Sequence, residues 1–195
     1  MEAILATDIS GGISREGKIP WKSKKDMQFF YEKTKNNVVI MGKNTFFSLP
    51  KKVRPLKDRL NIVLTTNPYY YINDPEYMQY PNLLFTDDEN IHNYIQQNRE
   101  KIYELYNECN ISLDKDFKIF IIGGKQIYEK YISLCDTIWH TTIKADWSCD
   151  LFFNYDYENE FKVKTLIEED NELQIIEWKK NFLSDEPLGA LGATI

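Results

Sequence analysis

The fold class of this chain is decided by the stretch Asn37-Val38-Val39-Ile40-Met41-Gly42-Lys43-Asn44-Thr45. Its first five residues are mostly apolar and rich in β-branched side chains, which predicts a buried strand. Gly42 ends that strand, and the residues from there to about Ser48 are predicted to form a short helix. A strand that leads through a glycine into a helix is typical of an α/β fold.

Strands and helices alternate on both sides of this stretch. Strands are predicted at residues 3–7, 37–41, 60–65, 82–86, 117–122 and 137–143, and helices begin near residues 26, 43, 88 and 125. Apolar residues at helical spacing from 91 to 106 predict one long helix there. The segments 10–18, 67–81 and 145–157 are predicted to be irregular, the second of them as a surface excursion.

The sheet is predicted to end in an antiparallel hairpin. The runs 161–167 and 173–178 flank the turn-forming pair Asp170-Asn171. The chain is therefore expected to form one α/β domain over residues 1–181. Its central sheet is doubly wound and mostly parallel, with about eight strands and antiparallel edges. Residues 182–195 are interpreted as a linker or tail.

Composition excludes several classes of function. The chain has 195 residues, of which 43% are hydrophobic, so it is long enough to bury a core of its own. A net charge of −6 argues against non-specific binding to nucleic acid. No apolar run is long enough to cross a membrane, and no signal peptide is found. Three widely spaced cysteines favour a reduced, cytoplasmic compartment.

Histidine-based chemistry has few candidates in this sequence. Only His92 and His140 are present, which leaves little room for a metal cluster or a Ser-His-Asp triad. His140 lies inside an apolar run and is interpreted as a core or edge histidine rather than a ligand. No metal site is predicted.

Asp26 is the one acid that heads an apolar helix, directly after the pair Pro20-Trp21. Two interpretations are open on this stretch alone. Asp26 is either a charge that stabilises the helix N-terminus, where acids are favoured, or the single polar anchor of an apolar pocket. Met27 and Phe30 would then belong to the pocket.

Two strand ends share a design that suits phosphate. Gly42-Lys43-Asn44-Thr45 follows one strand and Gly123-Gly124-Lys125-Gln126 follows another. Glycine permits close backbone approach, and a helix N-terminus favours anions. Either turn alone is most often a plain strand-to-helix connection, and neither matches a common nucleotide motif. Together they indicate a ligand with phosphate in two places, such as a dinucleotide.

A basic segment precedes the third predicted strand. Residues 51–59 hold five cations and one acid in an otherwise acidic chain. Such runs are usually solvated faces. Arg59, however, directly precedes a buried strand, where its guanidinium would be positioned to bind a carboxylate through two parallel hydrogen bonds.

Taken in order, these residues resemble the dihydrofolate reductase family over about residues 2–179. Each motif is weak alone, but their order and spacing together are specific. The segment 41–59 resembles eukaryotic members, whereas the spacing from Trp21 to Asp26 resembles bacterial ones. The matching pieces are Gly12-Ile13, Ile19-Pro20-Trp21, Asp26, residues 39–45, Arg54-Pro55-Leu56, Arg59, Ile121-Ile122-Gly123-Gly124 and Ile127-Tyr128.

The resemblance implies the fold of that family and its reaction, the NADPH-dependent reduction of 7,8-dihydrofolate to 5,6,7,8-tetrahydrofolate in one-carbon and thymidylate metabolism. Antifolates such as methotrexate would then bind the same site. Hydride passes to C6 of the pterin and a proton to N5, without a protein nucleophile. Positioning and exclusion of water supply the catalysis.

The resemblance also implies the roles of residues that bind the substrate. Asp26 is expected to hydrogen-bond the pterin and to be the catalytic acid, with a pKa raised by burial. Arg59 is expected to bind the α-carboxylate of folate, and Thr141 to bond the acid. The expected pocket walls are Ile4, Leu5, Ala6, Met27, Phe30, Ser48, Leu49 and Ile122.

A second set of residues is implied to bind NADPH. It comprises Ala6, the mobile loop Gly12, Ile13, Ser14, Arg15, Glu16, Gly17 and Lys18, the adenosine phosphate side at Gly42, Lys43, Asn44, Thr45, Thr65 and Thr66, and the residues Gly123, Gly124, Lys125, Gln126, Ile127 and Tyr128. The family joins Gly123 and Gly124 by a cis peptide. Three positions depart from the family pattern. Ser14 replaces a glycine, and Thr66 and Gln126 replace cations of some members, which leaves Lys43 as the main charge.

Three alternatives remain open. The first is a pyrimidine reductase of riboflavin synthesis, which shares the fold, and the second is a catalytically silent binding module. The third is one half of a bifunctional chain that is fused to, or works with, thymidylate synthase.

Overall fold

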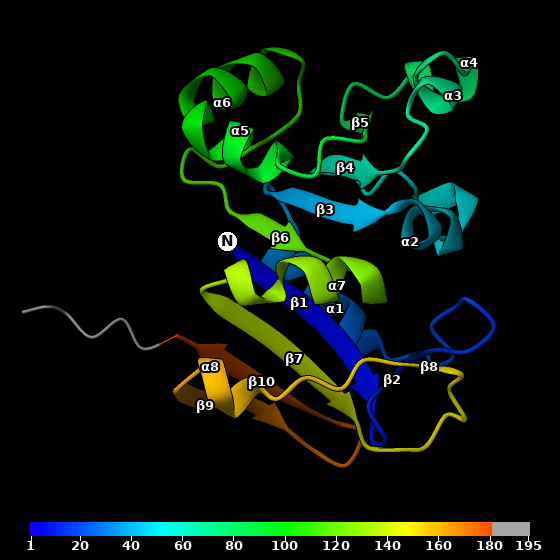
Figure 1. The fold of residues 1–195 in the computed structure, drawn as a ribbon, viewed down its shortest axis with the longest axis vertical. Coiled ribbons are helices and arrows are strands. Elements are labelled where there is room, and N and C mark those ends of the chain that lie inside the picture. The colour runs from blue at the N-terminus through cyan, green and yellow to red at the C-terminus, as the bar shows by residue number, and fades with distance from the viewer. Residues whose placement is uncertain (181–195) are drawn as a thin grey trace, which may run out of the picture.

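An eight-stranded sheet organises residues 1–180, which the computed structural model describes (Figure 1). The strands are β1 (Glu2–Asp8), β3 (Val38–Gly42), β4 (Leu60–Leu64), β5 (Leu83–Thr86), β6 (Ile119–Ile121), β7 (Thr137–Ile143), β9 (Val163–Glu169) and β10 (Leu173–Lys179). Their order is β5-β4-β3-β6-β1-β7-β10-β9. The pairs from β5 to β7 are all parallel, and β10 is antiparallel to both of its neighbours. The predicted fold class is confirmed, and the predicted tail lies outside the described residues.

Helices cover both faces of this sheet. In Figure 1, α7 (Lys125–Tyr131) lies in front of the central strands and α1 (Lys24–Thr34) lies behind them. The other helices are α2 (Lys43–Ser48), α3 (Tyr69–Ile72), α4 (Pro75–Met78), α5 (Ile91–Gln97), α6 (Arg99–Glu108) and α8 (Tyr157–Glu160), with 3₁₀ turns at Lys51–Val53 and Ile132–Leu134.

The central strands are buried on both faces, and this explains their near-continuous apolar sequence. Because side chains alternate along a strand, Ile4 packs with Val39 and Ile122 on the face of α1, whereas Leu5 packs with Ile40 on the face of α7. Burial of each such aliphatic side chain contributes roughly 1.5–3 kcal/mol. The two faces therefore hold separate apolar clusters, with the sheet between them.

The predicted long helix from 91 to 106 is wrong in one respect, because the chain forms two helices, α5 and α6, that meet at Asn98. The side-chain Nδ2 of Asn98 donates to the carbonyl of Tyr94 at 2.8 Å. Asparagine competes for backbone groups in this way and is disfavoured inside helices. The apolar spacing continues through the break, so periodicity alone does not reveal it.

The three segments predicted to be irregular contain short elements. Residues 67–81 form α3 and α4, and Tyr71 stacks on Phe85 with ring centroids 4.7 Å apart. Residues of the first and third segments pair as β2 (Gly12–Ser14) and β8 (Leu151–Phe152), an antiparallel ribbon outside the main sheet. The pairing of β2 with β8 joins segments that are far apart in the chain, so it has no local signal in the sequence. The packing of Tyr71 likewise depends on neighbours that only the fold brings together.

Candidate active site

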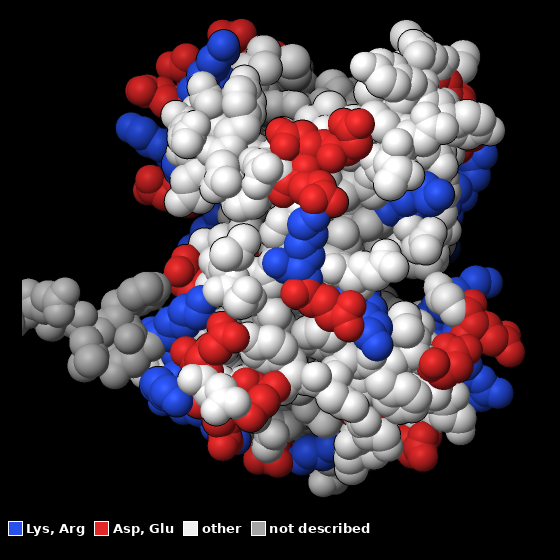
Figure 2. Space-filling view, viewed as in Figure 1, with Lys and Arg blue, Asp and Glu red and all other residues white. Residues whose placement is uncertain are grey.

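The carboxyl ends of the parallel strands bring the expected site residues to one edge of the sheet. Ala6 lies near the end of β1, Gly42 ends β3, Thr65 follows β4 and Ile122 follows β6. Parallel strands end at the same edge, which is where ligands bind in open α/β sheets. In Figure 2 the surface is indented at the right-hand side, between the region of α2 and the loop that contains β2.

Asp26 occupies the first turn of α1 and is also partly buried against the sheet. Its backbone N–H donates to Oγ of Ser23, the N-cap residue, at 3.2 Å. Burial raises the pKa of the Asp26 carboxyl above its ordinary value, while the polar side chains of Thr141 and Trp21 act in the opposite direction. The two interpretations of Asp26 are therefore compatible, because a first-turn acid here also faces the interior.

Most of the expected pocket walls lie on the α1 face of the sheet and are at least half-buried, with two exceptions. Ile4, Ile122 and Thr141 are buried, and Ala6 is the register partner of Thr141 across β1 and β7. Phe30, Ser48 and Leu49 are half-buried on the same side. The side chain of Leu5 lies on the opposite face of the sheet, as strand alternation requires. Met27 is 61% exposed, so it contributes little to the burial of Asp26.

Arg59 is a buried cation that the described chain does not neutralise. Its side chain is 5% exposed. Its Nη1 donates to Oγ1 of Thr34 at 3.0 Å and its Nε donates to the carbonyl of Lys57 at 2.8 Å. No acidic side chain among residues 1–180 lies within ion-pair distance of it. A buried charge without a partner is costly, so the site suits an anionic ligand.

The two strand–glycine–helix turns lie side by side. The N–H of Gly42 donates to the carbonyl of Gly123 at 2.8 Å. A Cβ on Gly124 would lie 3.1 Å from Oγ1 of Thr45, and one on Gly42 would lie 3.1 Å from Cγ1 of Ile127. A side chain at either turn would therefore crowd its neighbour, and glycine leaves room for this close approach. The peptide between Gly123 and Gly124 is cis, as the family pattern implies.

Neither α2 nor α7 has a side-chain cap at its N-terminus. Gly42 and Gly124 occupy the two N-cap positions, and neither offers a side-chain acceptor to the first-turn amides. Two adjacent sets of backbone donors thus face the same edge, and such donors bind phosphate oxygens. This arrangement fits the two phosphates of a dinucleotide.

Lys43 is the cation best placed to add charge to this region. It is exposed and makes no ion pair with any residue between 1 and 180, whereas Nζ of Lys125 lies 3.7 Å from Oε1 of Glu129. Thr66 and Gln126 are exposed as well. Lys43 is thus an exposed cation, and uncharged residues occupy positions 66 and 126, as the sequence predicts.

Tyr128 connects the cofactor side to the substrate side. Its hydroxyl donates to the carbonyl of Ile4 at 2.9 Å, in the buried interior. Gly123 has a φ of +103°, and a Cβ there would lie 2.9 Å from the Tyr128 ring. The tyrosine ring therefore packs directly under the Gly123 turn and holds it against β1.

Asp8 and Asp150 hold the loop 12–18 and were not expected from the sequence. Oδ1 of Asp8 accepts from the N–H groups of Ser10 at 2.9 Å and Gly12 at 2.8 Å, and its Oδ2 accepts from Trp147 at 3.2 Å. Asp150 accepts from the N–H of Glu16 at 2.7 Å. Single acids in polar segments carry no local signal, although an aspartate at the end of an apolar strand, as at Asp8, is unusual.

Residues 1–180 contain neither a metal-binding cluster nor a membrane-spanning helix. No group of three or more His, Cys, Asp and Glu side chains in that range is arranged to hold a metal ion. No helix in the same range is long and apolar enough to cross a membrane. The three cysteines are free thiols.

The chain is similar to known proteins over most of its length. A family model described as dihydrofolate reductase matches residues 1–103 and 79–177. The dihydrofolate reductase of Ureaplasma parvum is 34% identical over 159 residues, which cover 82% of this chain and 85% of that protein. The dihydrofolate reductase of Aedes albopictus is 30% identical over 188 residues, covering 88% and 91%.

A bifunctional relative and a solved structure extend this similarity. The bifunctional dihydrofolate reductase-thymidylate synthase of Glycine max is 31% identical over 160 residues, which cover 77% of this chain and 27% of that protein. The structure of dihydrofolate reductase from Enterococcus faecalis, complexed with NADP(H) and RAB-propyl, superposes with a TM-score of 0.64 at 26% identity. It covers 92% of this chain and 95% of that chain.

Proposed function

Because the chain belongs to the dihydrofolate reductase family, which uses NADPH to reduce 7,8-dihydrofolate to tetrahydrofolate, we propose that the carboxyl edge of its sheet holds these two molecules side by side. The enzyme is an NADP-dependent oxidoreductase, and its product serves one-carbon and thymidylate metabolism.

The cofactor side of the site is formed by the two glycine turns. NADPH supplies the hydride when it is bound. The uncapped amides after Gly42 and Gly124 would bind its phosphates, and Lys43 would add the charge that favours a 2′-phosphate. The loop 12–18, anchored through Asp8 and Asp150, would cover the nicotinamide and exclude water.

On the substrate side of the site, α1 sets the spacing between Asp26 and Arg59. Thr34 is eight positions after Asp26 in α1, so the two residues lie about 12 Å apart along the helix axis. Thr34 in turn holds Arg59. Asp26 would bind the amino-pyrimidine edge of the pterin at one end, and Arg59 would bind the α-carboxylate at the other. An elongated ligand with a polar ring and a distant carboxylate fits this spacing.

Asp26 would also supply the proton that the reaction needs. Burial raises the pKa of its carboxyl, so the group holds a proton at higher pH than an exposed aspartate does. It would thereby favour protonation of N5, through a water molecule rather than by direct contact. Thr141 would hold the carboxyl in place from the sheet.

The observation that carries these assignments is the guanidinium of Arg59, which is buried without an acidic partner among residues 1–180 and is held by the same helix that presents Asp26. A silent binding module does not need a raised carboxyl pKa at one end of such a helix. A pyrimidine reductase of riboflavin synthesis does not need an arginine for a glutamate tail.

The direct test follows the absorbance of NADPH in the presence of purified protein and dihydrofolate. We expect absorbance to fall at a rate proportional to enzyme, to fall more slowly with NADH, and to stop when methotrexate is added. Rapid oxidation of NADPH without dihydrofolate, or no oxidation with it, would contradict the proposal.

We also propose that the protein works with thymidylate synthase, does not bind nucleic acid and is located in the cytoplasm. Bifunctional relatives support a fusion or partnership with thymidylate synthase. On the face drawn in Figure 2, acidic and basic side chains are interspersed, which supports the expected lack of nucleic-acid binding. Three free thiols support the predicted cytoplasmic location. Co-purification with thymidylate synthase activity would test the partnership.

A further inference from the structure

Asn61 is a fully buried polar side chain in a strand whose other buried residues are apolar. It is the second residue of β4 and is 0% exposed. Asparagine is depleted in strands and is mostly exposed in proteins. A buried amide is costly unless its donors and its acceptor are hydrogen-bonded. The contacts of the Asn61 side chain are therefore what keeps it in this position.

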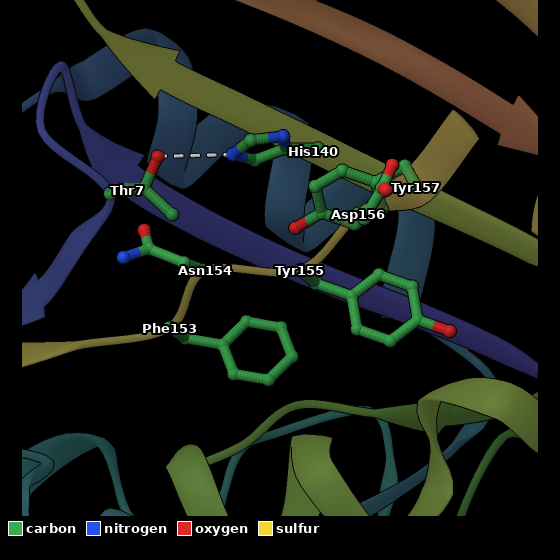
Figure 3. Close-up of a pocket in the computed structure, with 8 residues that line it drawn as sticks. Thr7, His140, Phe153, Asn154, Tyr155, Asp156 and Tyr157 are labelled. Carbon is green, nitrogen blue, oxygen red and sulfur yellow. Dashed lines mark hydrogen bonds between the residues drawn. The ribbon is translucent and has the colours of Figure 1, made fainter. Parts of the chain in front are cut away.

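The side chain of Asn61 bonds to the loop that precedes its own strand. Elsewhere in the sheet a polar side chain bonds to the neighbouring strand, as Figure 3 shows for the hydroxyl of Thr7, which lies 3.0 Å from Nε2 of His140. Oδ1 of Asn61 instead accepts from the N–H of Leu56 at 2.9 Å. Its Nδ2 donates to the carbonyls of Leu56 at 2.9 Å and Arg59 at 3.0 Å. One buried amide thus closes the loop from Leu56 to Arg59.

Asn82, which directly precedes β5, supports the same two backbone groups. Its Nδ2 donates to the carbonyl of Leu56 at 3.2 Å and to that of Arg59 at 3.1 Å. Two carbonyl oxygens therefore converge on two amide groups. Buried carbonyls of this kind need donors, and without a donor between them their partial negative charges repel. The shape of the loop thus depends on the donors of Asn61 and Asn82.

This loop and α1 together set the position of the Arg59 guanidinium. Its Nε donates to the carbonyl of Lys57, inside the loop, and its Nη1 donates to Oγ1 of Thr34 on α1. These bonds leave Nη2 and the second N–H of Nη1 without a partner among residues 1–180. A carboxylate accepts two parallel bonds from such a fork only in one orientation. A shift of the loop would move the fork away from that orientation.

We propose that Asn61, supported by Asn82, is a positioning residue that holds Arg59 in the geometry for binding the carboxylate of the substrate. The two amides order the loop before the ligand arrives, so that less conformational freedom is lost on binding. They act through Arg59 and not on the reacting atoms. The inference rests on the proposed function, because it takes Arg59 as the residue that binds the carboxylate.

Asn82→Ala is the first test, because it removes one amide and keeps Asn61. The dissociation constant for folate, measured by fluorescence titration, should rise about three to ten times, the cost of ordering one more group on binding. The dissociation constant for a diaminopteridine without the glutamate tail should not change. In turnover, KM for dihydrofolate should rise while kcat is kept, since the chemical step does not use Arg59.

Asn61→Asp is a stronger test of the same bonds. It keeps the shape and one oxygen of the side chain, but it places a second oxygen where Nδ2 donates to the carbonyls of Leu56 and Arg59. The affinity for folate should fall about tenfold or more, again with less change for the ring without the tail. Asn82→Ala decides the matter by itself where Asn61→Asp is too unstable to purify.

Asn107→Ala is the matched control. Asn107 is half-buried like Asn82, and its Nδ2 also donates to two carbonyls, those of Tyr103 at 2.8 Å and Leu113 at 3.3 Å. Urea unfolding should show that both variants are less stable than the wild type. Only Asn82→Ala should bind folate more weakly, because the bonds of Asn107 do not reach the loop that carries Arg59.

Three results would overturn the inference. They are wild-type affinity for folate in Asn82→Ala, a parallel loss of affinity for the ring without the tail, and an equal loss for folate in Asn107→Ala. Arg59→Leu, measured alongside, separates this failure from that of the proposed function. If Arg59→Leu weakens folate binding and Asn82→Ala does not, only the positioning role is wrong. If Arg59→Leu binds folate normally, the assigned role of Arg59 is wrong and the positioning role falls with it.

Discussion

Asp26 combines a position in the first turn of a helix with burial, and the two act on its charge in opposite senses. The N-terminus of α1 favours the carboxylate through the helix dipole. Burial in the fold favours the neutral acid, and the net effect is a pKa above the ordinary value. A carboxyl poised in this way can both bind a cationic edge of the pterin and keep a proton near it.

The first prediction concerns the chemical step. Asp26→Asn keeps the shape of the side chain but cannot hold an exchangeable acid proton, so turnover at pH 7 should fall by about 10²–10⁴-fold. The affinity for NADPH should stay the same. Glu32→Gln, an exposed acid on the same helix, is the matched control and should be as active as the wild type. Turnover of Asp26→Asn near the wild-type value would remove Asp26 from its role.

The second prediction concerns stability at the same residue. Because the folded pKa of Asp26 is raised, the native state binds this proton more tightly than the unfolded chain. The stabilisation of the native state that this proton gives is fully present below the ordinary pKa of about 3.9, and it is lost as pH rises through the pKa of the folded state. Asp26→Asn should therefore have a higher Tm than the wild type at neutral pH, with the gap closing in acid. An equal Tm at pH 7 would show that burial has little effect on this carboxyl.

The third prediction concerns Arg59. Arg59→Leu should weaken the binding of folate by about 2–5 kcal/mol, since a buried carboxylate loses its partner. A pteridine without the glutamate tail should bind both proteins alike, which separates the lost contact from any change in the fold. The two dissociation constants are measured by fluorescence titration. A parallel loss for both ligands would mean that Arg59 supports the structure rather than the carboxylate.

At the scale of elements, Asp8 joins the end of β1 to two loops. It is 1% exposed and accepts three backbone hydrogen bonds, from Ser10, Gly12 and Trp147. These bonds fix where the loop 12–18 begins relative to the segment that carries β8. Although burial opposes the charge, the backbone hydrogen bonds lower the pKa of Asp8 below its ordinary value. The loop expected to cover the nicotinamide is thus anchored at its base by a charged group.

The fourth prediction tests this anchor. Asp8→Ala leaves several buried donors unpaired and should lower the free energy of unfolding by about 3 kcal/mol. Asp8→Asn keeps one side-chain oxygen that can accept from Ser10 and Gly12, so its free energy of unfolding should fall by less. The stability that comes from a lowered carboxyl pKa is present above the ordinary pKa and is lost as pH falls, so the wild type and Asp8→Asn should converge in acid while Asp8→Ala stays less stable. Urea unfolding at pH 7 and at pH 3 measures both effects, and an unaffected Asp8→Ala at pH 7 would exclude the anchor.

For the whole molecule, the dependence of stability on pH should be dominated in mild acid by a histidine outside the active site. Burial lowers the pKa of His140 from 6.5 to about 4. Below pH 6.5 the unfolded chain takes up this proton and the native state does not, so stability falls between pH 6.5 and about 4.

The fifth prediction is that His140→Gln flattens this part of the curve. The Tm of the variant, measured at half-unit intervals of pH, should decline less than that of the wild type across the window from 6.5 to about 4. His92→Gln changes the other histidine and serves as the comparison. An unchanged slope in His140→Gln would show that another group controls the acid limb.

The core strands could be predicted because each carries its signal within a few residues. β3, β4 and β6 are apolar on both faces, and the sequence of such a strand is nearly continuous in apolar residues. Conversely, the break at Asn98 and the ribbon of β2 and β8 could not be predicted. One is a single side chain that competes with the backbone, and the other pairs segments more than a hundred residues apart.

The sequence by itself determined the α/β class, the order of the strands along the chain, and the acid and the arginine expected to bind the substrate. It could do so because periodicity, glycine turns and basic runs are local, and because the ordered motifs resemble one family, which implies the role of the acid. Only the tertiary structure decided that Leu5 faces away from Asp26, that Arg59 is buried without an acidic partner among residues 1–180, and that Asp8 holds two loops together. These properties depend on distance and burial between remote segments, which exist only once the sheet has formed and its two faces are covered.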